Sequence, residues 1–259
     1  MPLAQLADTG VHYDLSGPDN LPVLVFSNSL GTTLEMWESQ VGGFSKRFRV
    51  LRYDTRGHGR SDATPGDYTI SQLAGDVLQL LDFLRLERVF FCGLSMGGAI
   101  GIYLGCYAPQ RFQKLALCNT AAKFGTAETW NARIQAVRSG GMKAVAAGVL
   151  ERWLTREFRD AHSAETQATL AMLESANPLG YLSCCAAVRD VDARPYLGRV
   201  SVPSLVLTGT HDPVTPPSEA RYLVSSIPGS RYAEVSAAHL SNIEARDDFN
   251  RQVLNFLLS

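Results

Sequence analysis

Val89-Phe90-Phe91-Cys92-Gly93-Leu94-Ser95-Met96-Gly97-Gly98-Ala99 is the stretch that decides the fold of this chain. An apolar run typical of a buried strand ends in the pattern Gly-x-Ser-x-Gly, and a helix-compatible segment, 99–107, follows it. This is the pattern of a nucleophile elbow, a sharp strand-to-helix turn that holds the serine in a strained conformation at the edge of a sheet. We interpret Ser95 as a nucleophile; the alternative is a glycine-rich turn with an incidental serine.

The start of the helix after Ser95 supplies a second expectation. Backbone N–H groups at a helix N-terminus point toward an oxyanion formed on an attacked carbonyl, and the N–H of Met96 is the expected donor. A serine hydroxyl is a poor nucleophile near neutral pH, so it needs a histidine base and an acid that orients the histidine.

The chain has five histidines, and their surroundings select one as the base. His239 lies in a loop of small residues between an expected short strand and the last expected helix. The others are interpreted as a surface residue (His12), a residue of a tight polar turn (His58), a solvated helix residue (His162) and a residue at the end of a strand (His211).

Asp212 is the expected acid, because it comes shortly after the apolar run 204–209. Ser95 and His239 also follow apolar strands. Since the carboxyl ends of parallel strands meet at one edge of a sheet, the three side chains are predicted to converge there. The chain order Ser95, Asp212, His239 is consistent with this arrangement.

Composition indicates a globular protein with a sizeable core. The 259 residues are 46% hydrophobic and 19% charged, and a chain of this size can form one large α/β domain. A net charge of −1 gives no electrostatic reason to expect nucleic acid or an anionic membrane as a partner. The N-terminal residues lack the pattern of a signal peptide, and no apolar run approaches membrane-spanning length, so we expect a cytoplasmic location.

The five cysteines are scattered and odd in number, which does not fit a disulfide framework. We expect reduced thiols that pack as small hydrophobes. None of them has metal-ligand spacing with a histidine, so no metal site is expected. They are Cys92, Cys106, Cys118, Cys184 and Cys185.

Alternating apolar runs and helical patterns predict a mostly parallel sheet covered by helices on both faces. The expected strands are 11–15 at an edge, 22–27, 49–53, 89–94, 114–119, 204–208 and 231–235. The expected helices are 70–86, 99–107, 218–227 and 245–258.

The alternation stops between Thr120 and Val191, where helices are expected at 128–139, 142–154, 162–175 and 178–188. We predict a helical cap, 121–191, inserted into a core of residues 1–120 and 192–259. The alternative is a set of helices that only cover the sheet. Insertions at the carboxyl ends of strands normally build the substrate pocket, which favours the cap.

Four motifs together resemble the α/β-hydrolase family over nearly the whole chain. They are Arg56-Gly57-His58-Gly59-Arg60-Ser61, Gly93-Leu94-Ser95-Met96-Gly97-Gly98, Gly209-Thr210-His211-Asp212 and His239.

Two further segments resemble the 3-oxoadipate enol-lactonases of the β-ketoadipate pathway. These are Phe26-Ser27-Asn28-Ser29-Leu30-Gly31-Thr32 with Met36-Trp37, and Asn119-Thr120-Ala121-Ala122-Lys123 with Trp130-Asn131-Ala132-Arg133-Ile134. Most relatives carry His-Gly where this chain has Asn28-Ser29, and the enol-lactonases resemble it in that departure.

The resemblance implies hydrolysis of a small enol-lactone to 3-oxoadipate by a Ser-His-Asp triad, without a metal or an organic cofactor. It aligns Leu30 with the second oxyanion donor, through its backbone N–H. Ser27 and Asn28 are expected either to contact the substrate or only to hold the loop. The departure at Asn28-Ser29 leaves the backbone role intact and puts a side-chain role in doubt.

An enol-lactone of a dicarboxylic acid keeps one free carboxylate, which a guanidinium can bind with two parallel hydrogen bonds. Arg133 is the expected ligand for that carboxylate; the alternative is a solvated surface arginine. Trp130, three residues earlier, shares its helix face. It is expected to form a pocket wall or to anchor the cap.

Other functions fit the same pattern. A generic carboxylesterase, a carbon–carbon bond hydrolase or a cofactor-free perhydrolase would share the triad and differ in the cap pocket. A non-catalytic ligand receptor of this fold is a different class. A dehalogenase is disfavoured, because that chemistry uses a carboxylate where this chain has Ser95.

Overall fold

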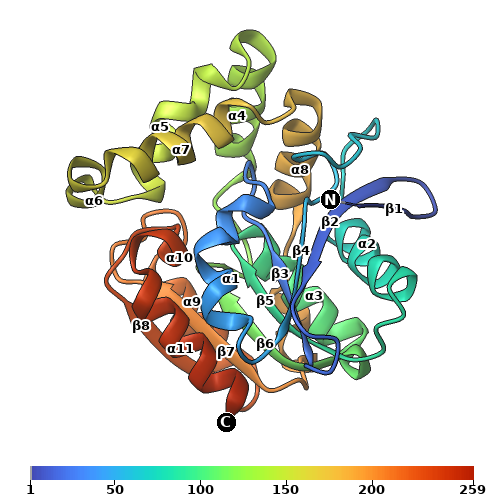
Figure 1. The fold of residues 1–259 in the computed structure, drawn as a ribbon. Coiled ribbons are helices and arrows are strands. Elements are labelled where there is room, and N and C mark those ends of the chain that lie inside the picture. Colours follow the sequence, from blue (N-terminus) through green and yellow to red (C-terminus); the bar gives the residue numbers. More distant parts are fainter. Residues whose placement is uncertain (1) are drawn as a thin grey trace.

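An eight-stranded sheet forms the centre of the computed structural model, which describes residues 2–259 (Figure 1). In space the strands follow the order β1-β2-β4-β3-β5-β6-β7-β8. β1 and β2, and β2 and β4, pair antiparallel, whereas every neighbouring pair from β4 to β8 is parallel. The strands are β1 (Leu3–Gln5), β2 (Gly10–Ser16), β3 (Val23–Ser27), β4 (Arg49–Tyr53), β5 (Val89–Leu94), β6 (Phe112–Cys118), β7 (Ser204–Gly209) and β8 (Arg231–Val235).

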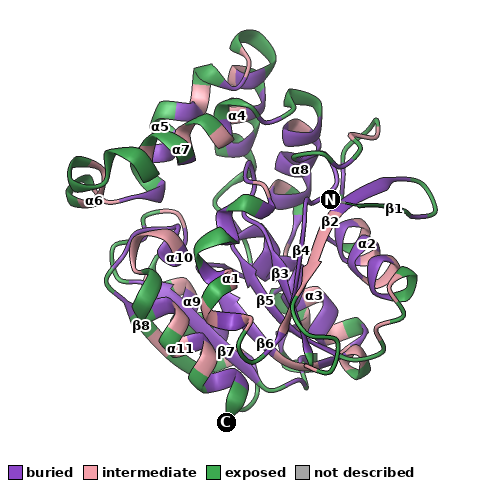
Figure 2. Cartoon of the chain, viewed as in Figure 1, coloured by how far each residue is buried: buried purple, intermediate pink, exposed green. Residues whose placement is uncertain are grey.

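The middle of the sheet is buried on both faces. β3, β5 and β7 are buried along their whole length (Figure 2), which explains their nearly continuous apolar sequences. The parallel topology brings the carboxyl ends of these strands to one edge. The loops that follow them therefore meet there, and they carry Asn28, Ser95 and Asp212.

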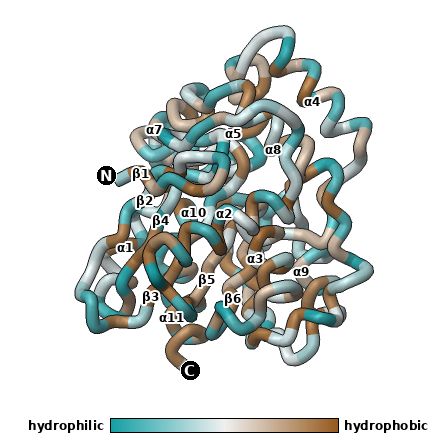
Figure 3. The backbone as a smooth tube through the Cα atoms, turned by 90° about the vertical axis from the view of Figure 1, so that its right-hand side faces the viewer, coloured by the Kyte–Doolittle hydropathy of each residue, from teal (hydrophilic) through white to brown (hydrophobic). Residues whose placement is uncertain are grey.

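Helices cover both faces of the sheet. α2 (Ile70–Phe83), α3 (Met96–Tyr107) and α9 (Pro217–Ser226) lie on one face, and α1 (Glu38–Phe44) and α11 (Arg246–Leu258) lie together on the other (Figure 1). α2 is amphipathic, and the side chain of Thr69 caps its N-terminus by accepting a hydrogen bond from the N–H of Gln72. α3 is apolar all round (Figure 3), because it packs between the sheet and its neighbours.

Five helices between β6 and β7 form a helical insertion beyond the carboxyl ends of the strands (Figure 1). Its outward faces are largely exposed (Figure 2). α4 packs against α5 and α8, and α5 packs against α7. The helical insertion consists of α4 (Ala127–Gly140), α5 (Lys143–Trp153), α6 (Arg156–Ala161), α7 (Ser163–Glu174) and α8 (Pro178–Asp190).

The predicted fold class is confirmed, and the main differences concern element ends and short elements. α3 begins at Met96 rather than at residue 99, because the glycines that follow Met96 have low helix propensity and hide the first turn. α2 ends before Arg85, whose φ of 56° cannot continue a helix. The pattern missed β1, α1, α6 and α10 (Ser241–Glu244), which are too short to show a clear period.

The expected surface position of His12 is wrong. β2 does not form the edge of the sheet, because β1 pairs with its outer side. His12 is therefore buried, and its Nδ1 lies 2.7 Å from Oδ2 of Asp54.

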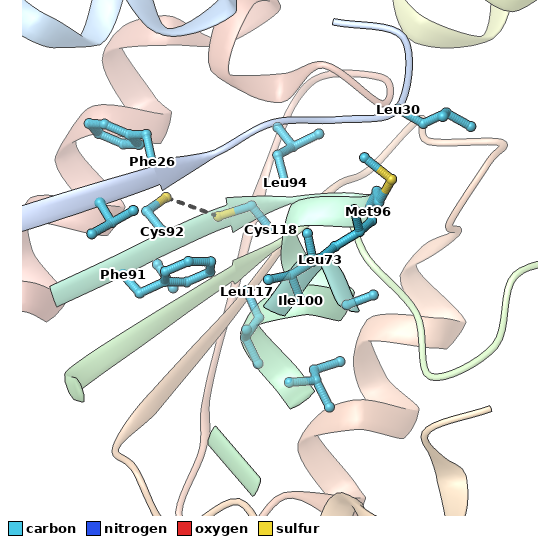
Figure 4. Close-up of a cluster of buried hydrophobic side chains, with 14 of the residues drawn as sticks. Phe26, Leu30, Leu73, Phe91, Cys92, Leu94, Met96, Ile100, Leu117 and Cys118 are labelled. Carbon is cyan, nitrogen blue, oxygen red and sulfur yellow. Dashed lines mark hydrogen bonds between the residues drawn. The ribbon is translucent and has the colours of Figure 1, made fainter. Parts of the chain in front are cut away.

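The five cysteines are all free. Figure 4 shows Cys92 and Cys118 in the apolar cluster beside Phe26, Leu94 and Met96, with their sulfur atoms 3.9 Å apart. Burial raises the pKa of the Cys92 thiol well above its ordinary value, so this sulfur stays protonated and packs as a hydrophobe. Within residues 2–259, none of the helices has both the length and the apolar character needed to span a membrane.

Candidate active site

Ser95 occupies the turn between β5 and α3, with a φ of 58° and a ψ of −115°. The two glycines of the elbow make this turn possible. A Cβ on Gly93 would lie 2.1 Å from the carbonyl oxygen of Gly97, and a Cβ on Gly97 would lie 2.2 Å from that of Ser27. Any larger residue would push the strand, the helix or the neighbouring loop apart, so the strained serine depends on both glycines.

Asp212 and His239 meet at the same edge of the sheet. Asp212 follows β7, His239 lies between β8 and α10, and both side chains are buried. Nδ1 of His239 lies 2.8 Å from Oδ2 of Asp212. An imidazole held in this way by a carboxylate directs its other nitrogen outward, which is the orientation that a general base needs.

Four donors besides His239 surround the Asp212 carboxylate. The side chains of Asn119 and Thr215 donate to Oδ2 at 2.9 and 2.8 Å, and the N–H groups of Val214 and Thr215 donate to Oδ1 at 2.7 and 3.0 Å. Burial alone would raise the pKa of Asp212. The charge and hydrogen bond of His239 and the hydrogen bond of Asn119 outweigh burial, and the pKa lies below its ordinary value. The carboxylate is therefore ionised and fixed.

Ser95 and His239 line the same small cavity under the helical insertion, together with Leu30. Trp130 and Trp153 of the insertion form part of the opposite wall. The volume of about 20 Å³ holds about one water molecule. The core thus contributes Ser95, His239 and Leu30 to this cavity, and the insertion contributes the two tryptophans and Arg133.

The backbone of the Leu30 loop has an unusual hydrogen-bond pattern. The N–H groups of Ser29, Gly31 and Thr32 donate to Sδ of Met36, Nε2 of His58 and the Ser29 carbonyl. The Leu30 N–H, in contrast, has no acceptor within residues 2–259, although Leu30 is buried. Because buried N–H groups are rarely left unpaired, this group is available to an oxyanion in the cavity.

A direct contact joins this loop to the elbow. The N–H of Gly97 donates to the carbonyl of Asn28 at 3.0 Å, which fixes the loop beside the start of α3. Met96 begins that helix, and its side chain is fully buried in the core (Figure 4). The two expected oxyanion donors, at Leu30 and Met96, therefore lie on neighbouring segments that are held together.

Of the two roles left open for Ser27 and Asn28, their position favours the one in which they only hold the loop. Both side chains are fully buried. The hydroxyls of Ser27 and Tyr53 are hydrogen-bonded at 2.7 Å, and the Asn28 amide donates to the Tyr53 carbonyl and accepts from Nε1 of Trp37. Their polar atoms are thus used inside the core, where they hold the loop.

Trp130 and Arg133 share one face of α4, as their spacing predicts. The Arg133 guanidinium carbon lies 4.7 Å from the centre of the Trp130 ring, and both side chains line the cavity. The Trp130 Nε1 donates to the Phe124 carbonyl at 2.7 Å, so this side chain is both a wall and an anchor for α4.

Residues 22–246 match the family model described as the alpha/beta hydrolase fold. The chain belongs to the α/β-hydrolase fold family. Among curated relatives, this hydrolase is 41% identical to 3-oxoadipate enol-lactonase 2 of Acinetobacter baylyi and 38% identical to 3-oxoadipate enol-lactonase 1 of the same organism. Each alignment covers 95% of this chain and 92% of the relative.

Among solved structures, the hydrolase is similar to the enol-lactonase from Burkholderia xenovorans LB400. The two superpose with a TM-score of 0.98 at 45% sequence identity, over 100% of both chains. A thermophilic esterase from Thermogutta terrifontis shares the fold at 25% identity, with a TM-score of 0.93 over 99% of this chain and 98% of the esterase. These matches confirm the resemblance to enol-lactonases that the sequence motifs indicated.

Sequence reasoning gave no role to several residues that shape the hydrolase site. Asn119 donates to Asp212 and also to the Ala238 carbonyl, and so ties the acid to the loop of His239. The available signal was a polar side chain at the carboxyl end of the expected strand 114–119. His58, in the expected polar turn, accepts from the Gly31 N–H at 2.8 Å and so supports the Leu30 loop.

Proposed function

We propose that this protein is a 3-oxoadipate enol-lactonase, which opens the lactone to 3-oxoadipate in the catabolism of aromatic compounds. The observation that carries the proposal is the Arg133 guanidinium in the wall of the Ser95 cavity. No carboxylate within residues 2–259 forms an ion pair with it. A site that cleaves an ester and offers an unpaired guanidinium suits an ester that also carries a carboxylate. The similarity to two enol-lactonases supports the same substrate.

In the first half of the proposed reaction, Oγ of Ser95 attacks the lactone carbonyl carbon while Nε2 of His239 takes the hydroxyl proton. Asp212 keeps the imidazole in the required orientation and stabilises its positive charge. The tetrahedral intermediate then collapses, and the bond between the carbonyl carbon and the ring oxygen breaks. The ring opens to an acyl-enzyme, and the departing enolate takes the proton from His239, so the imidazole is neutral again before the second half.

In the second half, His239 removes a proton from water, and the hydroxide attacks the acyl carbon. The ester bond to Ser95 breaks, Oγ recovers its proton from His239, and the open-chain product leaves with a second carboxylate. In each half, the N–H groups of Leu30 and Met96 donate to the oxyanion. Their fixed positions stabilise the charge without reorganisation of the site.

The helical insertion is proposed to act as a cap, formed by residues 121–191 on a core of residues 1–120 and 192–259. It contributes Trp130, an apolar wall for the ring, and Arg133, which binds the free carboxylate. The proposed partner is this small lactone alone. We further propose a cytoplasmic location, where a reducing environment suits five free thiols.

Turnover of the enol-lactone and of a neutral aryl ester tests the proposal. Ser95→Ala should abolish both reactions in a folded protein, because both need the nucleophile. Arg133→Leu should cost about 2–4 kcal/mol in kcat/KM on the lactone, for a broken charge pair, and leave the aryl ester nearly unaffected. Equal losses on both substrates would remove the carboxylate role from Arg133. A parent enzyme that prefers the neutral ester would instead be a general carboxylesterase.

A further inference from the structure

A groove of about 550 Å³ lies in the helical insertion, on the far side of the side chains that cover the catalytic cavity. α4 and α5 form its sides and pack against each other (Figure 1). Phe124, Trp130, Arg133 and Val214 line both spaces. These four side chains form a layer that the two spaces share, so the groove is positioned to lead into the cavity.

The charge of the groove is one-sided. Arg133 from α4 and Arg152 from α5 both line it, and its lining includes neither aspartate nor glutamate. Arg152, like Arg133, has no ion-pair partner within residues 2–259. Arg138 and Arg159 of the insertion also form no ion pair within residues 2–259, but neither lines the groove. The groove thus concentrates unneutralised positive charge near the catalytic cavity.

The two guanidiniums also interact with each other. Partial removal from water and the positive charge of Arg133 both lower the pKa of Arg152. Like charges held together in a groove repel each other until an anion enters, and an anion that contacts both is bound more tightly than one that contacts either alone.

The cavity volumes indicate when such an anion would bind. The catalytic cavity has room for about one water molecule, whereas a lactone ring is several times larger. The shared layer must therefore move before the ring can reach Ser95. The groove is already large enough for a small organic anion, so the first binding step can occur there.

We propose that Arg152 and Arg133 make this groove a carboxylate-binding vestibule, in which the carboxylate of the incoming lactone docks before the ring passes Trp130. The inference rests on the proposed function for the identity of the lactone. Arg133 borders both spaces, so it keeps hold of the carboxylate while the ring moves inward, and Arg152 acts only in the docking step. Arg152 is thus a binding residue of the encounter complex and has no part in the chemistry.

Calorimetric titration with adipate, an unreactive six-carbon dicarboxylate, tests the vestibule without any turnover. Arg152→Gln should weaken adipate binding about three- to tenfold, the loss expected for a partly exposed charge pair, and Arg152→Glu should weaken it further. Arg138→Gln is the matched control, because Arg138 is an exposed arginine of α4 outside the groove, and it should bind adipate like the parent. Adipamide, the neutral analogue, should bind none of these proteins measurably.

Three results would overturn the vestibule: a parent that does not bind adipate, an Arg152→Gln variant that binds it like the parent, or equal binding of adipate and adipamide.

Kinetics on the enol-lactone give a separate readout. Arg152→Gln should raise KM and leave kcat unchanged, and a fall in kcat alone would contradict a docking role. If the parent binds adipate through Arg152 but does not open the lactone, the proposed function fails and the carboxylate site stands.

Discussion

The protein has two buried histidine–aspartate pairs of nearly the same geometry, in different surroundings. His239 and Asp212 approach to 2.8 Å at the carboxyl edge of the sheet, and His12 and Asp54 approach to 2.7 Å between β2 and the loop after β4. Each carboxylate also accepts backbone N–H groups, as Asp54 does from Leu34. Distance and burial alone would assign the same role to both pairs.

The second nitrogen of each imidazole distinguishes the pairs. His239 lines the cavity that it shares with Ser95. Nε2 of His12, in contrast, is shielded from water and has no hydrogen-bond partner within residues 2–259. A base must exchange its proton with a substrate or with water, so only the first pair has the surroundings that catalysis requires. The pair at His12 is therefore a structural pair.

The largest expected effect is the loss of turnover in His239→Gln. Glutamine can still donate to Asp212 and fill the space, but it cannot take the proton from Ser95. We expect kcat to fall by ~10⁴-fold or more, with little change in the free energy of unfolding. Steady-state kinetics on a variant shown to be folded by circular dichroism measure both quantities. Turnover near the parental rate would mean that another group is the base.

A smaller loss is expected for Asn119→Ala, which leaves both members of the catalytic pair in place. Asn119 orients Asp212 and the loop of His239, so its removal should let the pair drift and lower kcat by about 10–100-fold. The KM of the lactone should change little, because Asn119 does not line the cavity. A variant that changes only KM would show that Asn119 acts on substrate binding instead.

The sequence predicted the convergence of Ser95, Asp212 and His239 because each lies in the loop or turn that follows a strand. In a parallel sheet such residues share one edge, so local patterns suffice to bring distant positions together. Their catalytic roles stay predictions until the variants are measured. The spacing of Trp130 and Arg133 likewise predicted that they share one face of a helix, and in the structure both lie on the same face of α4.

The sequence could not predict positions that depend on distant partners. Whether Ser27 and Asn28 face a substrate or the core depends on Tyr53 and Trp37, and no local pattern connects these residues. His12 was misplaced for a similar reason, because a strand of only three residues, β1, covers the outer side of β2. Tertiary contacts decide such cases.

His12→Leu is expected to have the opposite profile to His239→Gln. Leucine has no donor for Asp54 and leaves a buried carboxylate with fewer partners, which should cost about 1–3 kcal/mol in the free energy of unfolding. Turnover at a temperature where the variant is folded should stay close to that of the parent. Urea unfolding and kinetics on the same preparation test this. A stable but inactive His12→Leu variant would reverse the assignment of the two pairs.

The smallest expected effect concerns His58, a third buried histidine, which accepts the Gly31 N–H through Nε2. Burial lowers the pKa of His58 below its ordinary 6.5. As the pH falls below about 6.5, the unfolded chain takes up a proton at this position while the native state stays neutral, so the native state loses stability. A single group can contribute at most about 1.4 kcal/mol per pH unit in this way.

His58→Gln keeps an acceptor for Gly31 and removes the titration. Urea unfolding at pH 7.5 and pH 5.5 should therefore show a smaller loss of stability in the variant than in the parent, and parallel losses would mean that His58 carries a proton in the native state.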